Sequence, residues 1–218
     1  MTFPATDEDG FGPEEVIRQT GVSRETIQRI TRYLTVLGEW RERINLIGPG
    51  EVGRLWRRHV LDSAQLLENI SPAEKSVADL GSGAGFPGLI LACALAEREG
   101  ASVTLVEKSP RKSQFLEAAI REVGLPARVL NQRLEVEGDG EKFDIVTARA
   151  LAPLPRLLGY AHGWLKPSGK ALLMKGMGAA AEVAEARETW TFEMSATPSL
   201  TSPEGQILRV SALRPRRA

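Results

Sequence analysis

The chain has 218 residues, of which 42% are hydrophobic and 26% charged, and its 28 basic side chains balance 28 acidic ones. This composition is typical of a globular protein and excludes a disordered chain, a collagen-like repeat and a disulfide scaffold. The balanced charge excludes a protein permanently coated with nucleic acid, but leaves transient binding through a local basic patch open. One cysteine and two histidines exclude an internal disulfide and a cysteine-based zinc site, so no metal is expected.

No targeting signal is expected from the N-terminal residues. Its first twelve residues are acidic and lack the basic and apolar runs of a signal peptide, and we expect them to be mobile. The longest apolar stretch, residues 89–96, is far shorter than the ~20 residues that a membrane span needs. These features predict a soluble, cytoplasmic protein with no membrane partner.

Residues 1–74 have a helical hydrophobic pattern. Pro13 can begin a first helix and Gly21 can end it. A second helix is expected from an apolar stripe over residues 27–44, and a third from the pattern over residues 52–70. This part is predicted to be a helical extension packed on the rest of the chain.

Residues 75–218 alternate short β-type runs with helical runs, which predicts a mostly parallel sheet flanked by helices in one compact unit. Two late β-type runs are expected to form a hairpin on the edge of that sheet. The expected strands are 76–80, 102–107, 127–130, 143–148, 170–174, 191–197 and 206–213, and the expected helices 89–99, 110–123, 154–165 and 179–190.

The first strand of this region runs into a glycine-rich loop. Gly81, Gly83 and Gly85 occupy alternate positions, where the absence of a Cβ lets the backbone turn tightly and approach a ligand. Residues 83–88 match the dinucleotide fingerprint G-x-G-x-x-G, with Glu107 downstream for a ribose. The fingerprint begins two residues too late after the strand, however, and a proline inside it removes an N–H that a pyrophosphate would use.

S-adenosylmethionine is the second cofactor class that such a loop can bind. It has no phosphate and carries a sulfonium and an ammonium, so acidic neighbours favour it. Asp79 precedes the glycines and Glu107 ends the second strand, so both carboxylates should face one crevice. The alternative is a purely structural role, in which Asp79 caps the loop and Glu107 is an ordinary charge at the end of a strand. The methyltransferase interpretation is preferred.

Six segments, in chain order, give the sequence a specific family resemblance that covers roughly residues 30–213. The chain resembles the bacterial 16S rRNA guanine-N7 methyltransferases of the glucose-inhibited division protein B family. The segments are RHVLDS (58–63), DLGSGAGFPG (79–88), LVEKSPRK (105–112), NQRLE (131–135), TARA (147–150) and LMKG (173–176). The resemblance implies a Rossmann-like class I methyltransferase fold with a seven-stranded sheet.

The resemblance also implies roles for individual residues. Arg149 would position cofactor and substrate at the floor of the site, and Asp62 and His59 would face the same mouth or pair with each other. Residues expected at S-adenosylmethionine are Gly81, Phe86, Glu107, Leu134, Glu135 and Arg149, joined by Asp79, Gly83 and Gly85 from the loop pattern. Residues expected at RNA are Arg58, His59, Arg133 and Lys175.

The family's reaction methylates N7 of a guanine in 16S rRNA (position 527, in the 530 loop). That atom has a free lone pair, so the reaction needs alignment and no general base. The implied partner is 16S rRNA in the small ribosomal subunit or an assembly intermediate, and the protein is expected to be a monomer. Two alternatives stay open from the residues alone, an NAD-dependent oxidoreductase and a non-catalytic RNA- or cofactor-binding module.

Overall fold

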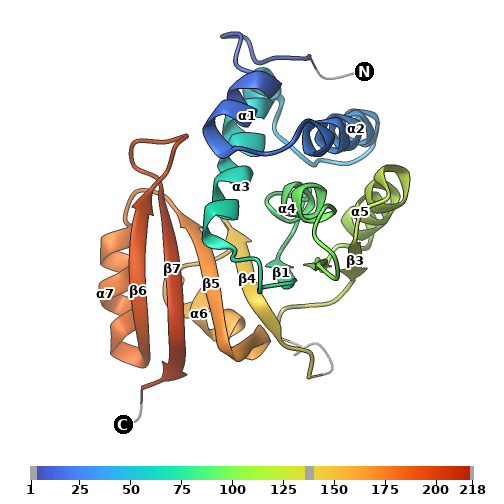
Figure 1. Ribbon diagram of the computed structural model, residues 1–218. Coiled ribbons are helices and arrows are strands. Elements are labelled where there is room, and N and C mark those ends of the chain that lie inside the picture. Colours follow the sequence, from blue (N-terminus) through green and yellow to red (C-terminus); the bar gives the residue numbers. More distant parts are fainter. Residues whose placement is uncertain (1–3, 136–139, 217–218) are drawn as a thin grey trace.

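The computed structural model describes residues 4–135 and 140–216 and contains a seven-stranded sheet with helices on both faces (Figure 1). The strand order is β3-β2-β1-β4-β5-β7-β6, and the first five of these strands are parallel. β7 runs antiparallel to both of its neighbours. The predicted mostly parallel sheet is therefore confirmed. The strands are β1 (Ser76–Leu80), β2 (Ser102–Val106), β3 (Ala127–Leu130), β4 (Phe143–Arg149), β5 (Leu165–Lys175), β6 (Trp190–Pro198) and β7 (Gln206–Pro215).

Successive side chains of the central strands enter two different hydrophobic cores. Val77 of β1 belongs to the core shared with helices α2, α4 and α5, and Ala78 belongs to the core shared with α6 and α7. Because both faces are covered, the strands consist largely of buried apolar residues. The helices are α4 (Gly88–Leu95), α5 (Pro110–Val123), α6 (Leu154–Trp164) and α7 (Ala179–Thr189), close to the predicted positions except that α4 ends earlier.

The N-terminal region contains two regular helices, α1 (Pro13–Thr20) and α2 (Arg24–Trp40). The expected stripe to Ile44 extends past the end of α2. Ile44 nevertheless packs against the core, because its main-chain N–H still donates to the carbonyl of Trp40 in the following turn. α2 shares one core with α4 and α5.

The third predicted helix, residues 52–70, is wrong as one continuous element. The structure has four short segments there: η1 (Pro49–Arg54, 3-10), η2 (Trp56–Leu61, a π-helical turn), α3 (Asp62–Ala64) and η3 (Gln65–Asn69, 3-10). Periodicity finds the apolar face of such a run but does not distinguish these hydrogen-bond patterns. In Figure 1 the run stands beside the loop between β6 and β7.

The stretch before α1 is docked on this run, so the expectation that it is mobile is wrong for the described residues 4–12. Asp7 and Phe11 are 5% and 4% exposed. The main-chain N–H of Glu8 donates to the carbonyl of Gly53, and the carboxylate of Asp7 accepts from the main-chain N–H groups of Trp56 and Arg57.

The order of the sheet reverses between β1 and β4. β1 pairs with β2 on one side and with β4 on the other, so the loops that follow β1 and β4 lead away from each other. In open α/β sheets, ligands bind at the carboxyl ends of the strands at such a point. Over residues 4–135 and 140–216, no helix is long and apolar enough to cross a membrane, and no cluster of three metal-binding side chains occurs.

Candidate cofactor and substrate site

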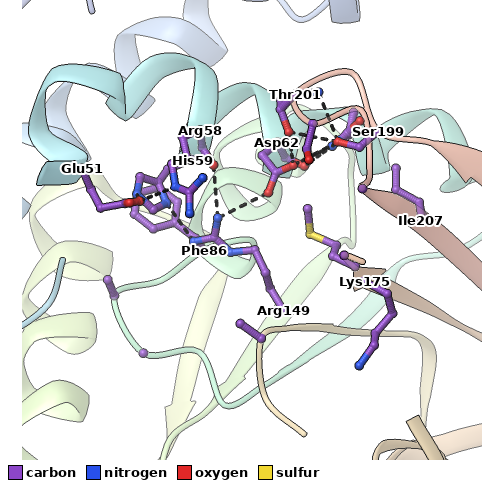
Figure 2. A pocket seen from close by; sticks show the side chains of 18 of the residues that line it. Glu51, Arg58, His59, Asp62, Phe86, Arg149, Lys175, Ser199, Thr201 and Ile207 are labelled. Carbon is purple, nitrogen blue, oxygen red and sulfur yellow. Dashed lines mark hydrogen bonds and ion pairs between the residues drawn. The ribbon is translucent and has the colours of Figure 1, made fainter. Parts of the chain in front are cut away.

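A cavity of about 600 Å³ lies where the strand order reverses, at the switch point of the sheet. Its wall is built from segments that are distant in the sequence. They are residues 46–48, the η1–η3 run, the glycine loop, the ends of β4 and β5, Glu182 of α7, and the β6–β7 turn with the start of β7. Figure 2 shows the side chains that gather there. Of the residues expected at the cofactor, the wall contains Gly81, Gly83, Phe86 and Arg149, and of those expected at RNA it contains Arg58, His59 and Lys175.

The glycines of the loop have different surroundings. Gly83 has φ +58°, and a Cβ there would meet only the carbonyl oxygen of Gly81, at 3.7 Å, so this position opens into the cavity. Gly85 has φ +95°, and a Cβ there would collide with Leu89 and approach the hydroxyl of Tyr33. Gly85 therefore lies inside the protein and serves the packing of the loop.

Asp79 also lies inside the protein, 1% exposed, and is not part of the cavity wall. Its carboxylate accepts from the main-chain N–H of Gly88 at 3.2 Å and from the hydroxyl of Thr147 at 3.0 Å. Burial raises the pKa of Asp79 to about 6, against the lowering effect of these hydrogen bonds. Its observed contacts correspond to the loop-capping alternative, in which it fixes the start of α4.

Glu107 follows β2 next to the glycine loop. One carboxylate oxygen accepts from the main-chain N–H of Gly83 at 3.0 Å and the other from that of Ser109 at 2.8 Å. The residue is 7% exposed and is not on the wall of the present cavity. Each carboxylate oxygen has a second lone pair, so Glu107 can still accept from a ligand hydroxyl.

The residues after β3 lie farther along the same edge and also outside the cavity wall. Leu134 packs against the second core. Glu135 accepts from the hydroxyl of Tyr160 and pairs with Arg156 and Arg133. A hydrogen bond from its own main-chain N–H, followed by these contacts, holds its pKa below the usual value. The side chain of Arg133 is 73% exposed.

Arg149 ends β4 and carries its guanidinium into the cavity, where it meets the η2–α3 run (Figure 2). Nη1 donates to the carbonyl of Arg58 at 3.2 Å and to the carboxylate of Asp62 at 3.4 Å. Nη2 lies 2.9 Å from Nδ1 of His59, and the guanidinium carbon is 5.4 Å from the ring centre of Phe86. This partly buried cation is thus satisfied by one short segment from the N-terminal region.

His59 and Asp62 do not pair with each other, which corrects that alternative. Both instead contact Arg149, from adjacent turns of the run. The imidazole of His59 stacks on Phe86, with ring centres 4.8 Å apart and planes 25° apart. Burial, and secondarily the charge of Arg149, lowers the pKa of His59 to about 4, so the ring is neutral at neutral pH.

The two remaining cations of the wall, Arg58 and Lys175, differ in the exposure of their side chains. The side chain of Arg58 is 61% exposed and pairs with Glu51. That of Lys175 is 12% exposed, and its ammonium contacts the carboxylate of Glu182 at 2.6 Å and the carbonyl of Ala152 at 3.1 Å. In Figure 2 the ammonium of Lys175 points away from the Arg149 cluster.

The β6–β7 turn forms a part of the wall that no sequence pattern indicates. The hydroxyl of Thr201 donates to the carboxylate of Asp62 at 2.6 Å, and Gln65 accepts from the main-chain N–H of Leu200 at 2.9 Å. Two charged residues of the wall that no sequence pattern indicates are Glu51 and Glu182, each paired with a cation there. These residues belong to none of the motifs, and more than 130 positions separate Asp62 from Thr201, so no local pattern joins them.

Comparisons with known proteins agree on one family. The model of the family described as GidB, rRNA small subunit methyltransferase G, matches residues 26–208. Two similar relatives are both named ribosomal RNA small subunit methyltransferase G. The one from Paramagnetospirillum magneticum is 46% identical over 201 residues, 92% of this chain and 95% of that protein. The one from Parvibaculum lavamentivorans is 45% identical over 195 residues, 89% of this chain and 86% of that protein.

Solved structures show the fold. An O-methyltransferase from Bacillus cereus in complex with SAH has a TM-score of 0.58 at 13% identity, over 89% of this chain and 94% of that one. A ribosomal protein L11 methylase from Lactobacillus delbrueckii subsp. bulgaricus has a TM-score of 0.56 at 19% identity, over 71% of this chain and 78% of that one. The fold is therefore that of the methyltransferases.

Proposed function

The chain belongs to the GidB family of rRNA small subunit methyltransferases, and from this we propose that it transfers the methyl group of S-adenosylmethionine to N7 of a guanine in 16S rRNA. The observation that carries the proposal is the position of the glycine loop and Arg149 on the wall of one cavity at the switch point of the sheet. The dinucleotide interpretation loses its basis, because membership in this family replaces the partial fingerprint as evidence.

The residues at the strand ends fit S-adenosylmethionine on two counts. Gly83 leaves open a space that a Cβ would fill, and the carboxylate of Glu107 beside it has lone pairs left for hydroxyl donors. When bound, S-adenosylmethionine supplies an electrophilic methyl group on a sulfonium. We propose that Gly81, Gly83 and Phe86 form the surface under it, that Glu107 accepts its ribose hydroxyls, and that Leu134 and Glu135 lie beside its adenine.

The part of the cavity beyond the glycine loop is where we propose that the guanine binds. The N7 lone pair attacks without losing a proton. The protein therefore has to align the base, exclude water and hold N7 ~3–3.5 Å from the methyl carbon. Arg149 is suited to this positioning because its guanidinium is fixed on three sides. Cys93 is buried with its pKa raised to about 12 and offers no nucleophile.

RNA binding is proposed to depend on local charge, since the net charge of the chain is zero. Arg58 at the mouth is the exposed cation of the wall, and Arg133 is an exposed cation farther along the same edge. Lys175 is already paired with Glu182, so we assign it a structural role at the wall. We further propose that the protein acts as a monomer in the cytoplasm on a small subunit or an assembly intermediate, where the target loop is held by its neighbours.

The deciding experiment is methyl transfer from labelled S-adenosylmethionine to small ribosomal subunits isolated from a strain that lacks this protein, with the modified base mapped. We expect one new N7-methylguanine in the 16S rRNA, and comparison with naked 16S rRNA identifies the preferred form of the substrate. Binding of S-adenosylmethionine without transfer to either substrate would contradict the proposal and favour a non-catalytic module.

A further inference from the structure

The guanidinium of Arg149 is held from outside the sheet that carries it. Its three polar contacts are the carbonyl of Arg58, the carboxylate of Asp62 and the imidazole of His59, all from five consecutive residues that precede β4 by more than 80 positions. The shortest of the three is the 2.9 Å contact with Nδ1 of His59. An arginine side chain without such contacts samples many rotamers, so these three contacts determine the position of the guanidinium charge.

The protonation of His59 follows from its neighbours. A guanidinium has donors and no acceptor, so Nδ1 of His59 must accept from Arg149 and cannot carry the proton. The proton therefore lies on Nε2, which is 2.9 Å from the carboxylate of Glu51. Glu51 is paired in turn with Arg58. A neutral ring is what burial and the nearby charge of Arg149 favour.

Stacking on Phe86 fixes the plane of the imidazole. The two rings are nearly parallel at 4.8 Å, and the guanidinium of Arg149 lies over the same Phe86 ring. Phe86 belongs to the glycine loop, so His59 contacts both the loop and Arg149. The side chain of His59 is only 8% exposed, which leaves little of it for the RNA phosphates it was expected to bind.

We propose that His59 is a positioning residue that fixes the guanidinium of Arg149 against Phe86 through the unprotonated Nδ1 of its imidazole. This inference rests on the proposed function and assigns His59 a role other than RNA binding. The lone pair on Nδ1 is the essential feature, because it directs one N–H of Arg149 and thereby the orientation of the planar group.

A matched pair of variants isolates that lone pair. Asn and Leu have nearly the same size, and both remove the ring, but Asn can present an acceptor oxygen at the position of Nδ1. With small subunits as substrate, we expect His59→Leu to lower kcat by about tenfold to a hundredfold. His59→Asn should recover at least about tenfold of that loss, with the affinity for S-adenosylmethionine unchanged in both. Equal kcat values in two folded variants would overturn the proposal.

Nitrogen NMR of the imidazole gives a readout that needs no substrate. The chain has two histidines, so a His162→Gln variant assigns the signals. We expect His59 to be neutral with Nδ1 unprotonated, and Arg149→Met, which removes the donor, to raise the pKa of His59. The groups facing the ring, Arg149, Arg58 and Glu51, account for its charge environment. A proton on Nδ1 in the unmodified protein would overturn the inference.

The two measurements separate the inference from the function on which it rests. A protein that transfers no methyl group to rRNA contradicts the proposed function, while the imidazole spectrum still decides whether His59 accepts from Arg149. Conversely, an active protein whose Asn and Leu variants behave alike keeps the proposed function and removes the role of His59.

Discussion

The carboxylate of Asp7 accepts a hydrogen bond from the main-chain N–H of Trp56 at 2.8 Å, across 49 positions of sequence. Its other oxygen accepts from the main-chain N–H of Arg57 at the same distance. These donors open the π-helical turn Trp56–Leu61, which contains His59. Asp7 therefore acts as a cap from outside the turn, in the way that N-cap side chains satisfy the free N–H groups of helix starts.

Removing that cap should loosen the turn. We expect Asp7→Ala to lower the free energy of unfolding by about 0.5–2 kcal/mol and to reduce kcat, because His59 loses its support. Asp9→Ala is the matched control, since Asp9 pairs with Arg57 at the surface and contacts a side chain of the turn rather than its backbone N–H groups. Urea unfolding and methyl transfer measured on both variants test this, and equal effects of the two changes would contradict it.

Gly83→Ala should weaken the binding of S-adenosylmethionine at least about tenfold, because the new methyl group enters the cavity. The left-handed backbone of Gly83 also makes any side chain cost about 1–2 kcal/mol of stability. Gly124→Ala is the control for that strain, since Gly124 has φ +74° at the end of α5 with no atom within 4 Å of an added Cβ. Calorimetric titration should show weakened binding for Gly83→Ala alone.

Two buried groups give the stability of the protein opposing pH dependences. Folding raises the pKa of Asp79 from 3.8 to about 6, so the folded state binds more protons in that window and stability falls as pH rises through it. Folding lowers the pKa of His59 from 6.5 to about 4, so the unfolded state binds more protons and stability falls as pH drops through that window. Each effect is on the order of 3 kcal/mol.

Single substitutions should expose the two slopes, which largely cancel in the unmodified protein. We expect Asp79→Asn to lose stability more steeply on acidification between the two pKa values, because the effect of His59 is no longer opposed. His59→Leu should gain stability over the same interval. Urea unfolding at a series of pH values measures both, and parallel curves for the two variants would refute the assignment.

Thr201→Val should release the β6–β7 turn from Asp62. The lost hydrogen bond is worth about 1 kcal/mol, and the amides of residues 199–205 should exchange faster with solvent. We expect methyl transfer to fall, because Asp62 also holds Arg149. Thr197→Val, at an exposed position on β6, is the matched control. If both variants exchange alike, the turn is not held by Thr201.

Arg58→Gln should reduce the salt dependence of rRNA binding by roughly 0.7–0.9 in the slope of log affinity against log salt, the value of one phosphate contact. Lys175→Met should leave that slope unchanged and lower stability instead, because it removes the partner of Glu182. Binding isotherms at several salt concentrations distinguish the two. A reduced slope for Lys175→Met would restore Lys175 as an RNA contact.

Most of the sheet could be predicted from the sequence because buried parallel strands read as short apolar runs between helical ones. α5 was predicted at its observed bounds, since Pro110 begins it and Gly124 follows its end in a left-handed conformation. The four segments of the η1–η3 run could not be predicted, because the apolar face of the run satisfies a helical period whichever hydrogen-bond pattern the backbone adopts.

The site was predictable only where a motif carried it. The glycine-rich loop indicates Gly81 and Gly83, the family resemblance indicates Arg149, and all three line the cavity. The partners of Arg149 depend on tertiary packing. The sequence therefore indicates that His59 and Asp62 lie at the mouth of the site, but not that both contact Arg149. The docking of Asp7 had no signal at all, since an acidic terminus reads as solvated chain until a partner with free N–H groups is known.

The composition of the cavity wall has a consequence for inhibition. Glu51 and Arg58 lie on one side of Arg149 and Ser199 and Thr201 on the other, and Phe86 of the glycine loop lies against its guanidinium. A small molecule that bridges these two sides would cover Arg149 and leave the space at Gly83 free. We expect such a compound to compete with rRNA, which sets it apart from cofactor analogues.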